Sequence, residues 1–195
     1  DLASQFVVIG GHYDHVGYGY TGGSRSNEYG QVHPGADDNA SGASGVLLAA
    51  EVLSRRFAGS GEPRRSFLFL GFSAEEMGLI GSREYVKASP IDASKITAML
   101  NMDMIGRLRD NKLDVHGTGT AAGFADLLKP MFDASGLTID PSPGGRGPSD
   151  HATFYGGGVP VLHFYTGLHE EYHTPRDTVD LINMEGAVRI VIQIL

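Results

Sequence analysis

Five short segments of this chain carry acidic residues or histidine, and each lies at the end of an apolar run. In order, they are His12-Tyr13-Asp14, Asp37-Asp38-Asn39, Glu75-Glu76, Asn101-Met102-Asp103 and Tyr172-His173-Thr174-Pro175. Together they supply two imidazoles, several carboxylates and one additional glutamate. Because an unpaired buried carboxylate is costly, a cluster of carboxylates at the ends of buried strands implies a cation. The ordered set therefore predicts a site for two divalent metals with a general base beside them.

Composition narrows the class of protein. The chain has 195 residues, 41% of them hydrophobic, which suits a single domain with a sizeable core. The formal net charge is -8 and no run rich in Lys and Arg offsets it, so we expect no nucleic-acid partner. The chain has no cysteine, so a metal must be bound through nitrogen and oxygen ligands. The sequence shows no signal peptide and no apolar run long enough to span a membrane.

The chain begins with Asp1 rather than Met, so we expect a processed or excised piece of a longer protein. A removed leader is compatible with this start, and we expect an exported protein, periplasmic or extracellular, rather than a cytoplasmic one. The absence of cysteine does not decide the compartment, because an exported bacterial domain need not carry disulfides. The sequence leaves the oligomeric state open.

The elements that must position these segments alternate between strand and helix. We expect strands at residues 5–10, 66–72, 96–102, 113–116 and 159–165, with loops at 18–35, 59–65 and 141–148. We expect helices at residues 40–57, after Glu75-Glu76 to about 88, 121–135 with a break or bend near Pro130, and 184–195. This alternation predicts a three-layer α/β/α sandwich with a mostly parallel, mixed central sheet. Ligands of such sheets gather beyond the carboxyl ends of the strands, where His12, Glu75-Glu76 and Asp103 are expected.

The segments GGHYDH, HPGADDNASG, FSAEEMGLIGS, NMDMIG, SDH and EYHTPRDT resemble the motif series of the co-catalytic di-zinc aminopeptidases. That family also contains glutamate carboxypeptidases and, more distantly, glutaminyl cyclases. The resemblance runs in the right order from about residue 7 to residue 179. Family members usually have more chain before the first metal-binding histidine, so upstream segments are expected to be missing here.

The resemblance implies a role for each matching residue. Asp37 resembles the carboxylate that bridges two Zn²⁺ ions. Glu76 and His173 would complete the ligand set of one ion, and His12 and Asp103 that of the other. Glu75 resembles the general base, and Asp14 resembles the carboxylate that orients His12. These roles agree with general chemistry. Two metals about 3.5–4 Å apart share an anionic ligand, and they lower the pKa of water to about 7, which gives a bridging hydroxide nucleophile. A glutamate beside that water can carry its proton to the leaving amine, and a carboxylate behind a histidine can fix the imidazole tautomer.

Each segment also has an interpretation without a metal. The segment at residues 37–39 could cap a helix, Glu75-Glu76 could be a solvated first turn, His12 could pack in the core, and His173 could lie in a plain turn. The ordered set of five favours the metal site over all of these together. His15 is given no ligand role, because it is expected to point elsewhere if His12 binds metal.

Two further motifs are interpreted as coincidences. His169–His173 matches the zinc-protease pattern H-E-x-x-H, which works only on a helix, and Pro175 disfavours a helix here. We therefore expect Glu75, and not Glu170, to be the base. Three consecutive residues at 149–151 cannot form a hydrolytic triad, although we expect His151 to line the pocket.

The function expected from these features is that of a zinc-dependent exopeptidase that removes N-terminal residues from peptide substrates. Hydrolysis follows from the metals and Glu75, whereas the aminopeptidase specificity follows from the resemblance alone. The open alternatives are a glutaminyl-cyclase-like enzyme with one zinc, a non-catalytic receptor-type domain, and a carboxypeptidase for acidic residues. The carboxypeptidase needs a basic pocket, for which the chain offers Arg107, Arg109 and Arg146. Arg146 and His151 are the candidate oxyanion donors.

Overall fold

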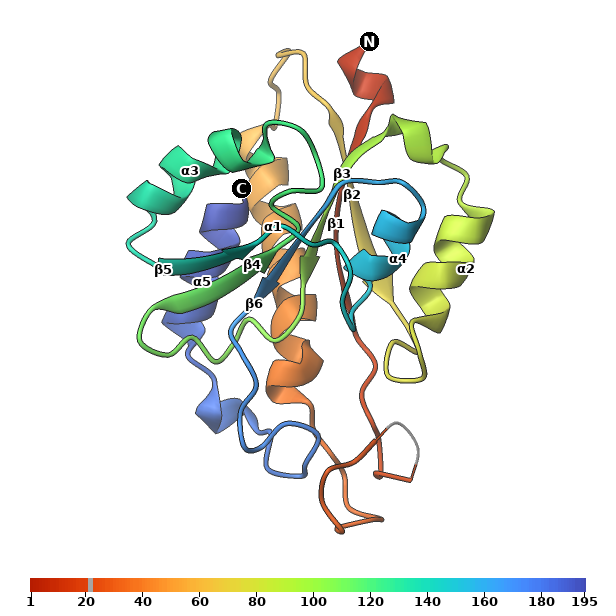
Figure 1. Cartoon of the computed structure of the whole chain (residues 1–195), viewed down its shortest axis with the longest axis vertical. Coiled ribbons are helices and arrows are strands. Elements are labelled where there is room, and N and C mark those ends of the chain that lie inside the picture. Colours follow the sequence, from red (N-terminus) through yellow and green to blue (C-terminus); the bar gives the residue numbers. More distant parts are fainter. Residues whose placement is uncertain (21–22) are drawn as a thin grey trace.

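The computed structural model describes residues 1–20 and 23–195, and its centre is a six-stranded sheet (Figure 1). The strands are β1 (Phe6–His12), β2 (Ser66–Phe72), β3 (Ile96–Met102), β4 (Lys112–His116), β5 (Thr138–Ser142) and β6 (Val161–Tyr165), in the order β2-β1-β3-β6-β4-β5. β1 pairs in parallel with both β2 and β3, and β3 pairs in parallel with β6. β4 is antiparallel to β6 and parallel to β5. The expected mostly parallel, mixed sheet is confirmed.

Helices cover both faces of this sheet and give the three expected layers. They are α1 (Gly42–Arg56), α2 (Ile80–Ala88), α3 (Phe124–Ala134), α4 (His151–Gly156) and α5 (Met184–Ile194). Successive side chains of a strand point to opposite faces, so β1 contributes Ile9 to one core and Val8 to the other. Ile9 lies in a cluster with side chains of α1, α3 and α5, and Val8 in a cluster with Phe154 of α4, against which Tyr85 of α2 packs.

Two elements were not expected from the sequence. β5 is short and mostly exposed, and Pro141 within it is tolerated because β5 is an edge strand. The six-residue helix α4 is too short to show a helical period. α3 runs through Pro130 without the expected break. Pro130 has no N–H group to donate to the carbonyl oxygen of Asp126, but both residues are exposed, so water can donate that hydrogen bond instead.

The segments next to the predicted site are irregular. Residues Ala36–Ser41 form a wide helical turn before α1, so α1 begins two residues later than expected. α2 begins only at Ile80, because Leu79 adopts a left-handed conformation with φ 60° and a turn occupies the residues after Glu75-Glu76. The expected loop at 18–35 is found at residues 18–20 and 23–35. Residues 21 and 22 lie outside the described residues. Within the described part of the chain, no helix has the length and apolar character that crossing a bilayer requires.

Candidate metal centre

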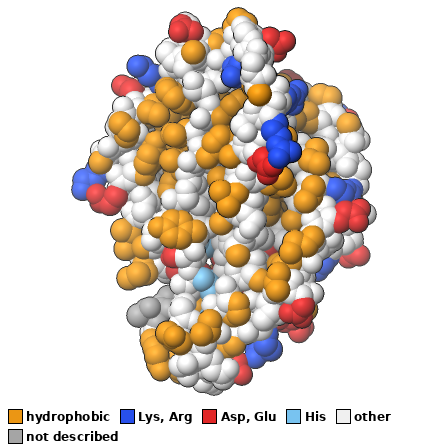
Figure 2. All heavy atoms as spheres, turned by 180° about the vertical axis from the view of Figure 1, so that it is seen from behind, with side chains coloured by type: hydrophobic (Ala, Val, Ile, Leu, Met, Phe, Trp, Pro, Cys, Tyr) orange, Lys and Arg blue, Asp and Glu red, His pale blue; other side chains and the backbone are white. Residues whose placement is uncertain are grey.

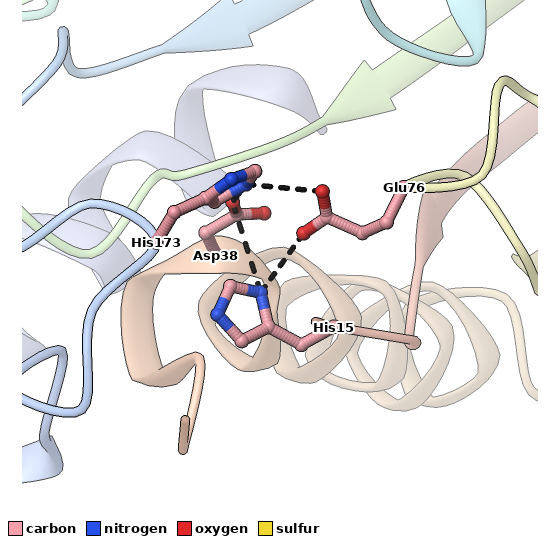
Figure 3. A group of neighbouring side chains, drawn as sticks. All are labelled: His15, Asp38, Glu76 and His173. Atoms are coloured by element: carbon pink, nitrogen blue, oxygen red, sulfur yellow. Dashed lines mark hydrogen bonds and ion pairs between the residues drawn. The ribbon is translucent and has the colours of Figure 1, made fainter. Parts of the chain in front are cut away.

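The carboxyl ends of three neighbouring strands bring the predicted residues together. His12 ends β1, Glu75 and Glu76 follow β2, and Asp103 follows β3, and these strands are adjacent in the sheet. The side chains form two groups of possible metal ligands: His12, Glu75 and Asp103 in one, and His15, Asp38, Glu76 and His173 in the other. Figure 3 shows the second group, whose members come from four separate segments and point toward one another.

Two short segments serve both groups. His12 and His15 belong to different groups, and so do Glu75 and Glu76. The carboxylate of Asp38 lies between the groups, with Oδ1 3.3 Å from His12 Nε2 and Oδ2 2.9 Å from His173 Nε2. Asp38 therefore has the position that a carboxylate shared by two ions requires.

The prediction that Asp37 bridges two ions is wrong by one residue. Asp37 is fully buried, and its Oδ1 accepts hydrogen bonds from Gly106 N at 2.7 Å and Ser41 Oγ at 3.0 Å. Its Oδ2 lies 3.3 Å from His169 Nε2. Neighbouring side chains diverge, so Asp37 ties the loop to the protein interior while Asp38 faces the two groups.

Asn39 and Asp177 hold the loop that carries Asp38, and the sequence interpretation gave neither of them a role. Asp177 accepts hydrogen bonds from the backbone N–H groups of Asp37 and Asp38 at 3.0–3.1 Å. Asn39 Nδ2 donates to the carbonyl oxygens of His12 at 3.2 Å and Met102 at 3.0 Å. These bonds join the loop to the ends of β1 and β3. Both residues are almost completely buried, but burial of a polar side chain is not visible in a sequence.

The tautomers of the two imidazoles are set by backbone carbonyls. His12 Nδ1 donates to the carbonyl oxygen of Asp14 at 3.0 Å, and His173 Nδ1 donates to that of Gly23 at 3.1 Å. A neutral imidazole that donates through Nδ1 has a lone pair on Nε2. Both Nε2 atoms face carboxylate oxygens, which are also electron-rich, so each contact requires a proton or a metal ion between the two atoms.

Asp14 acts on His12 differently from the prediction. Its backbone carbonyl, and not its carboxylate, accepts the imidazole N–H, because the carboxylate Oδ1 is 3.8 Å from His12 Nδ1. The carboxylate instead accepts the backbone N–H groups of Glu75 at 3.0 Å and Glu76 at 3.3 Å. Asp14 therefore fixes the tautomer of His12 through its main chain and the Glu75-Glu76 turn through its side chain.

The electrostatics of both groups favour a cation. Burial by itself lowers the pKa of His12, but the Asp103 and Asp38 carboxylates beside it raise that pKa to about 12. Burial also lowers the pKa of His173, which contacts with Asp38 and Glu76 raise to about 10. Burial raises the pKa of Asp38, but His12 and His173 hold it well below its usual range. The directions of these shifts show that the carboxylates attract positive charge.

Glu75 has the environment of a general base. Its side chain is 10% exposed, and its Oε2 lies 4.0 Å from His12 Nε2. Burial raises the pKa of Glu75 to about 9, although the charge of His12 opposes that rise. At this pKa Glu75 holds a proton at pH 7, and cations bound by the neighbouring ligands would lower the pKa and give the carboxylate that a base requires.

The residues present fit divalent metal ions. Within the described part of the chain, four buried atoms of the two groups make no hydrogen bond: His12 Nε2, His15 Nε2, His173 Nε2 and Asp103 Oδ1. Imidazole nitrogen and carboxylate oxygen are ligands that zinc takes in proteins. One ion would be held by Asp38, Glu76 and His173, and the other by His12, Asp38 and Asp103.

A family model named peptidase family M28 matches residues 2–195. The chain belongs to peptidase family M28.

This M28 chain is similar to aminopeptidase YwaD of Bacillus subtilis, with 29% identity over 93% of the chain and 38% of that protein. It is 35% identical to leupeptin-inactivating enzyme 1 of Streptomyces exfoliatus over 68% of the chain and 29% of that protein. The chain thus spans well under half of the length of these two relatives.

Solved structures give the same fold. The LapA aminopeptidase of Legionella pneumophila superposes with a TM-score of 0.77 at 25% identity, over 100% of this chain and 50% of its own. BSAP, a zinc aminopeptidase from Bacillus subtilis, gives 0.74 at 26% identity, over 96% of this chain and 44% of its own. A glutaminyl cyclase from Porphyromonas gingivalis gives a TM-score of 0.79 at 17% identity, over 98% of this chain and 72% of its own. At this identity the likeness shows the shared fold alone.

A cavity of about 630 Å³ opens beside the two groups of the M28 chain. Five of its lining residues are site residues, namely Asp38, Glu75, Glu76, Asp103 and His173. Its other lining is largely apolar or aromatic and includes Met104, Tyr165, Leu168 and Tyr172. In Figure 2 a histidine is visible in a hollow of the surface, with acidic side chains beside it. The two groups can therefore be reached from solvent through this cavity.

The H-E-x-x-H match is a coincidence, as the sequence predicted. The residues after His169 form turns and no helix, and His173 has a φ of 56°. His169 faces Asp37, His173 faces Asp38 and Glu76, and Glu170 is exposed. His169 and His173 therefore do not face a common ion, and Glu170 does not lie beside one.

The SDH segment contributes Ser149 to the cavity wall, where its Oγ accepts a hydrogen bond from Asn101 Nδ2 at 2.8 Å. His151 is fully buried, stacks on His163 with ring centroids 4.2 Å apart, and has a pKa lowered to about 4 by burial. Contrary to the expectation, His151 does not line the cavity. Arg146 is exposed and is not part of the cavity lining. Neither expected oxyanion donor is placed to contact a substrate in this cavity.

Proposed function

We propose that this chain is the catalytic domain of a zinc-dependent aminopeptidase that binds two zinc ions. The observation that carries the proposal is the pair of buried imidazole Nε2 atoms that face carboxylates on either side of one shared aspartate, Asp38. The names of relatives similar along most of this chain support the class of reaction. The donor set contains only nitrogen and oxygen, which suits zinc.

Each residue has a distinct task in the proposed hydrolysis. Bound zinc would supply Lewis acidity, which lowers the pKa of water and polarises a carbonyl group. Glu75 accepts the proton of the attacking water on its carboxylate and donates it to the nitrogen of the leaving amine. Asp14 keeps Glu75 in place by accepting its backbone N–H group, and the Glu75 side chain is only 10% exposed.

The acidic cavity suits the positively charged N-terminus of a peptide. The carboxypeptidase alternative requires a free basic side chain for the substrate carboxylate. Arg107 is paired with Glu171 at 3.0 Å, and Arg109 donates to the carbonyl oxygens of residues 166–168. Neither arginine is part of the cavity lining, whereas Arg83 lies at the cavity wall and is the side chain to test.

The test is hydrolysis of matched substrates by the zinc-loaded 195-residue chain. A panel of chromogenic aminoacyl substrates with free amines is compared with the same substrates after N-acetylation, and with dipeptides blocked at the N-terminus. We expect hydrolysis of the free-amine substrates only. Cleavage of N-blocked dipeptides, lost in Arg83→Ala, would establish the carboxypeptidase instead. Cyclisation of an N-terminal glutamine without peptide hydrolysis would establish the cyclase.

A further inference from the structure

His15 lies against the ligand group of Asp38, Glu76 and His173 (Figure 3). Its Nδ1 is 2.9 Å from Glu76 Oε1 and 3.8 Å from Asp38 Oδ2, and its side chain is only 9% exposed. The sequence motifs gave His15 no role. A buried imidazole at hydrogen-bond distance from a proposed metal ligand nevertheless needs an explanation, because burying a polar side chain is costly unless it is paired.

The two oxygens of Glu76 have different partners. Oε2 lies 3.0 Å from His173 Nε2, on the side where the proposed ion would be held. Oε1 lies 2.9 Å from His15 Nδ1. His173 Nε2 is also 2.9 Å from Asp38 Oδ2, whereas His15 Nδ1 is 3.8 Å from that oxygen, which is beyond hydrogen-bond distance. This asymmetry is the arrangement expected of an outer hydrogen-bond partner of Glu76.

The imidazole of His15 has little freedom to move. A side chain at Gly35 would collide with the Cγ and Cδ2 atoms of His15, so the ring fills the space that glycine leaves. On another side, the ring meets His173 edge to face, with centroids 5.4 Å apart and an angle of 79° between the planes. A ring held on two sides can fix the direction of the hydrogen bond that it donates.

We infer that His15 is a positioning residue for zinc. It donates its Nδ1–H to Glu76 Oε1 and thereby aims Oε2 at the ion shared with Asp38 and His173. Ligating carboxylates in metal sites are commonly hydrogen-bonded by such outer partners, whose loss weakens metal affinity about 10–100-fold. The inference rests on the proposed zinc site, but it concerns the strength of one ion's binding and leaves the reaction unchanged.

The experiment measures zinc affinity in a chain that retains only the relevant ion. Asp103→Ala removes a proposed ligand of the other ion, and competition with a chromogenic chelator then reports the affinity at Asp38, Glu76 and His173. In this background, we expect His15→Ala to weaken zinc binding about 10–100-fold. His15→Asn should recover much of the loss, because the asparagine amide can donate from nearly the position of Nδ1. His33→Ala, which removes another buried histidine, is the matched control and should bind as its parent does.

The outcomes separate this inference from the proposed function. Failure of the unsubstituted chain to bind zinc would reject the proposed function itself. Normal zinc binding with equal affinity in the His15→Ala variant would overturn the positioning role alone. Cobalt loading gives a second readout, because the visible spectrum of bound cobalt reports its ligands. A spectrum unchanged by His15→Ala supports the positioning role, and one that shows the loss of a nitrogen ligand would make His15 a ligand and overturn it.

Discussion

Replacing each of two adjacent aspartates should have opposite consequences. In Asp38→Ala, both proposed ions lose a ligand, because Oδ1 and Oδ2 face the two different groups. Loss of an outer hydrogen-bond partner alone costs about 10–100-fold in metal affinity, so loss of a shared ligand should cost more than about 100-fold at each ion. In Asp37→Ala, both ligand sets remain complete and two zinc ions should still bind.

The cost of Asp37→Ala should instead appear as lost stability. Gly106 N–H, which donates to Asp37 Oδ1 at 2.7 Å, would be left buried without an acceptor, whereas Ser41 Oγ keeps its bond to the Asp37 carbonyl. One unsatisfied buried N–H costs about 1–3 kcal/mol. For a domain of this size, that corresponds to a decrease in Tm of roughly 2–12 °C.

The assays are chelator competition for zinc content and thermal melting of the chelator-treated variants. The assignment of Asp38 as the bridging residue would be refuted if Asp37→Ala lost both ions while Asp38→Ala kept them. Loss of the same single ion in both variants would also refute it.

Three further predictions follow from the same geometry. Glu75→Gln should lower turnover on a chromogenic aminoacyl substrate about 10²–10⁴-fold with zinc content unchanged, whereas the exposed Glu170→Gln should change it little, and full activity of Glu75→Gln would contradict its role as base. In the Glu75→Gln background, zinc binding at pH 7 should release at least about two protons, because His12 with a pKa of about 12 and His173 with a pKa of about 10 are protonated before they bind and bound water can lose a further proton. Zinc affinity should therefore rise with pH, and calorimetry in buffers of different ionisation enthalpy measures the release, with none observed counting against these ligands. Asn39→Ala should lower the free energy of unfolding by about 2–6 kcal/mol in a denaturant titration, because the N–H groups of Gly42 and Met104 lose their acceptor, and an unchanged midpoint would contradict this.

The sequence was sufficient for the parts of the fold that consist of continuous apolar runs. β1, β2, β3 and β6 are such runs and were predicted, whereas their order in the sheet was not. β5 escaped prediction because it is a short, mostly exposed edge strand, and α4 because six residues are too few to show a period. Such elements depend on what they pack against rather than on their own pattern.

The candidate site was predictable in its outline and not in its details. The adjacent residues Asp37 and Asp38 have the same chemistry, and their orientation depends on Asp177 and Gly106, which are far away in the sequence. His15 follows His12 by three residues, and the irregular backbone after β1 directs the two rings into different groups. The motif series could therefore locate the segments, but the choice between neighbouring residues required the three-dimensional structure.

The most direct test of the two-ion site is a zinc titration of the chelator-treated 195-residue chain, followed by elemental analysis after gel filtration. The arrangement of His12, Asp103, Glu76 and His173 around Asp38 predicts saturation at about two zinc ions per chain, as a two-metal site requires. Saturation at one ion, with no second ion bound at higher zinc concentration, would contradict the shared role of Asp38 and the co-catalytic account built on it.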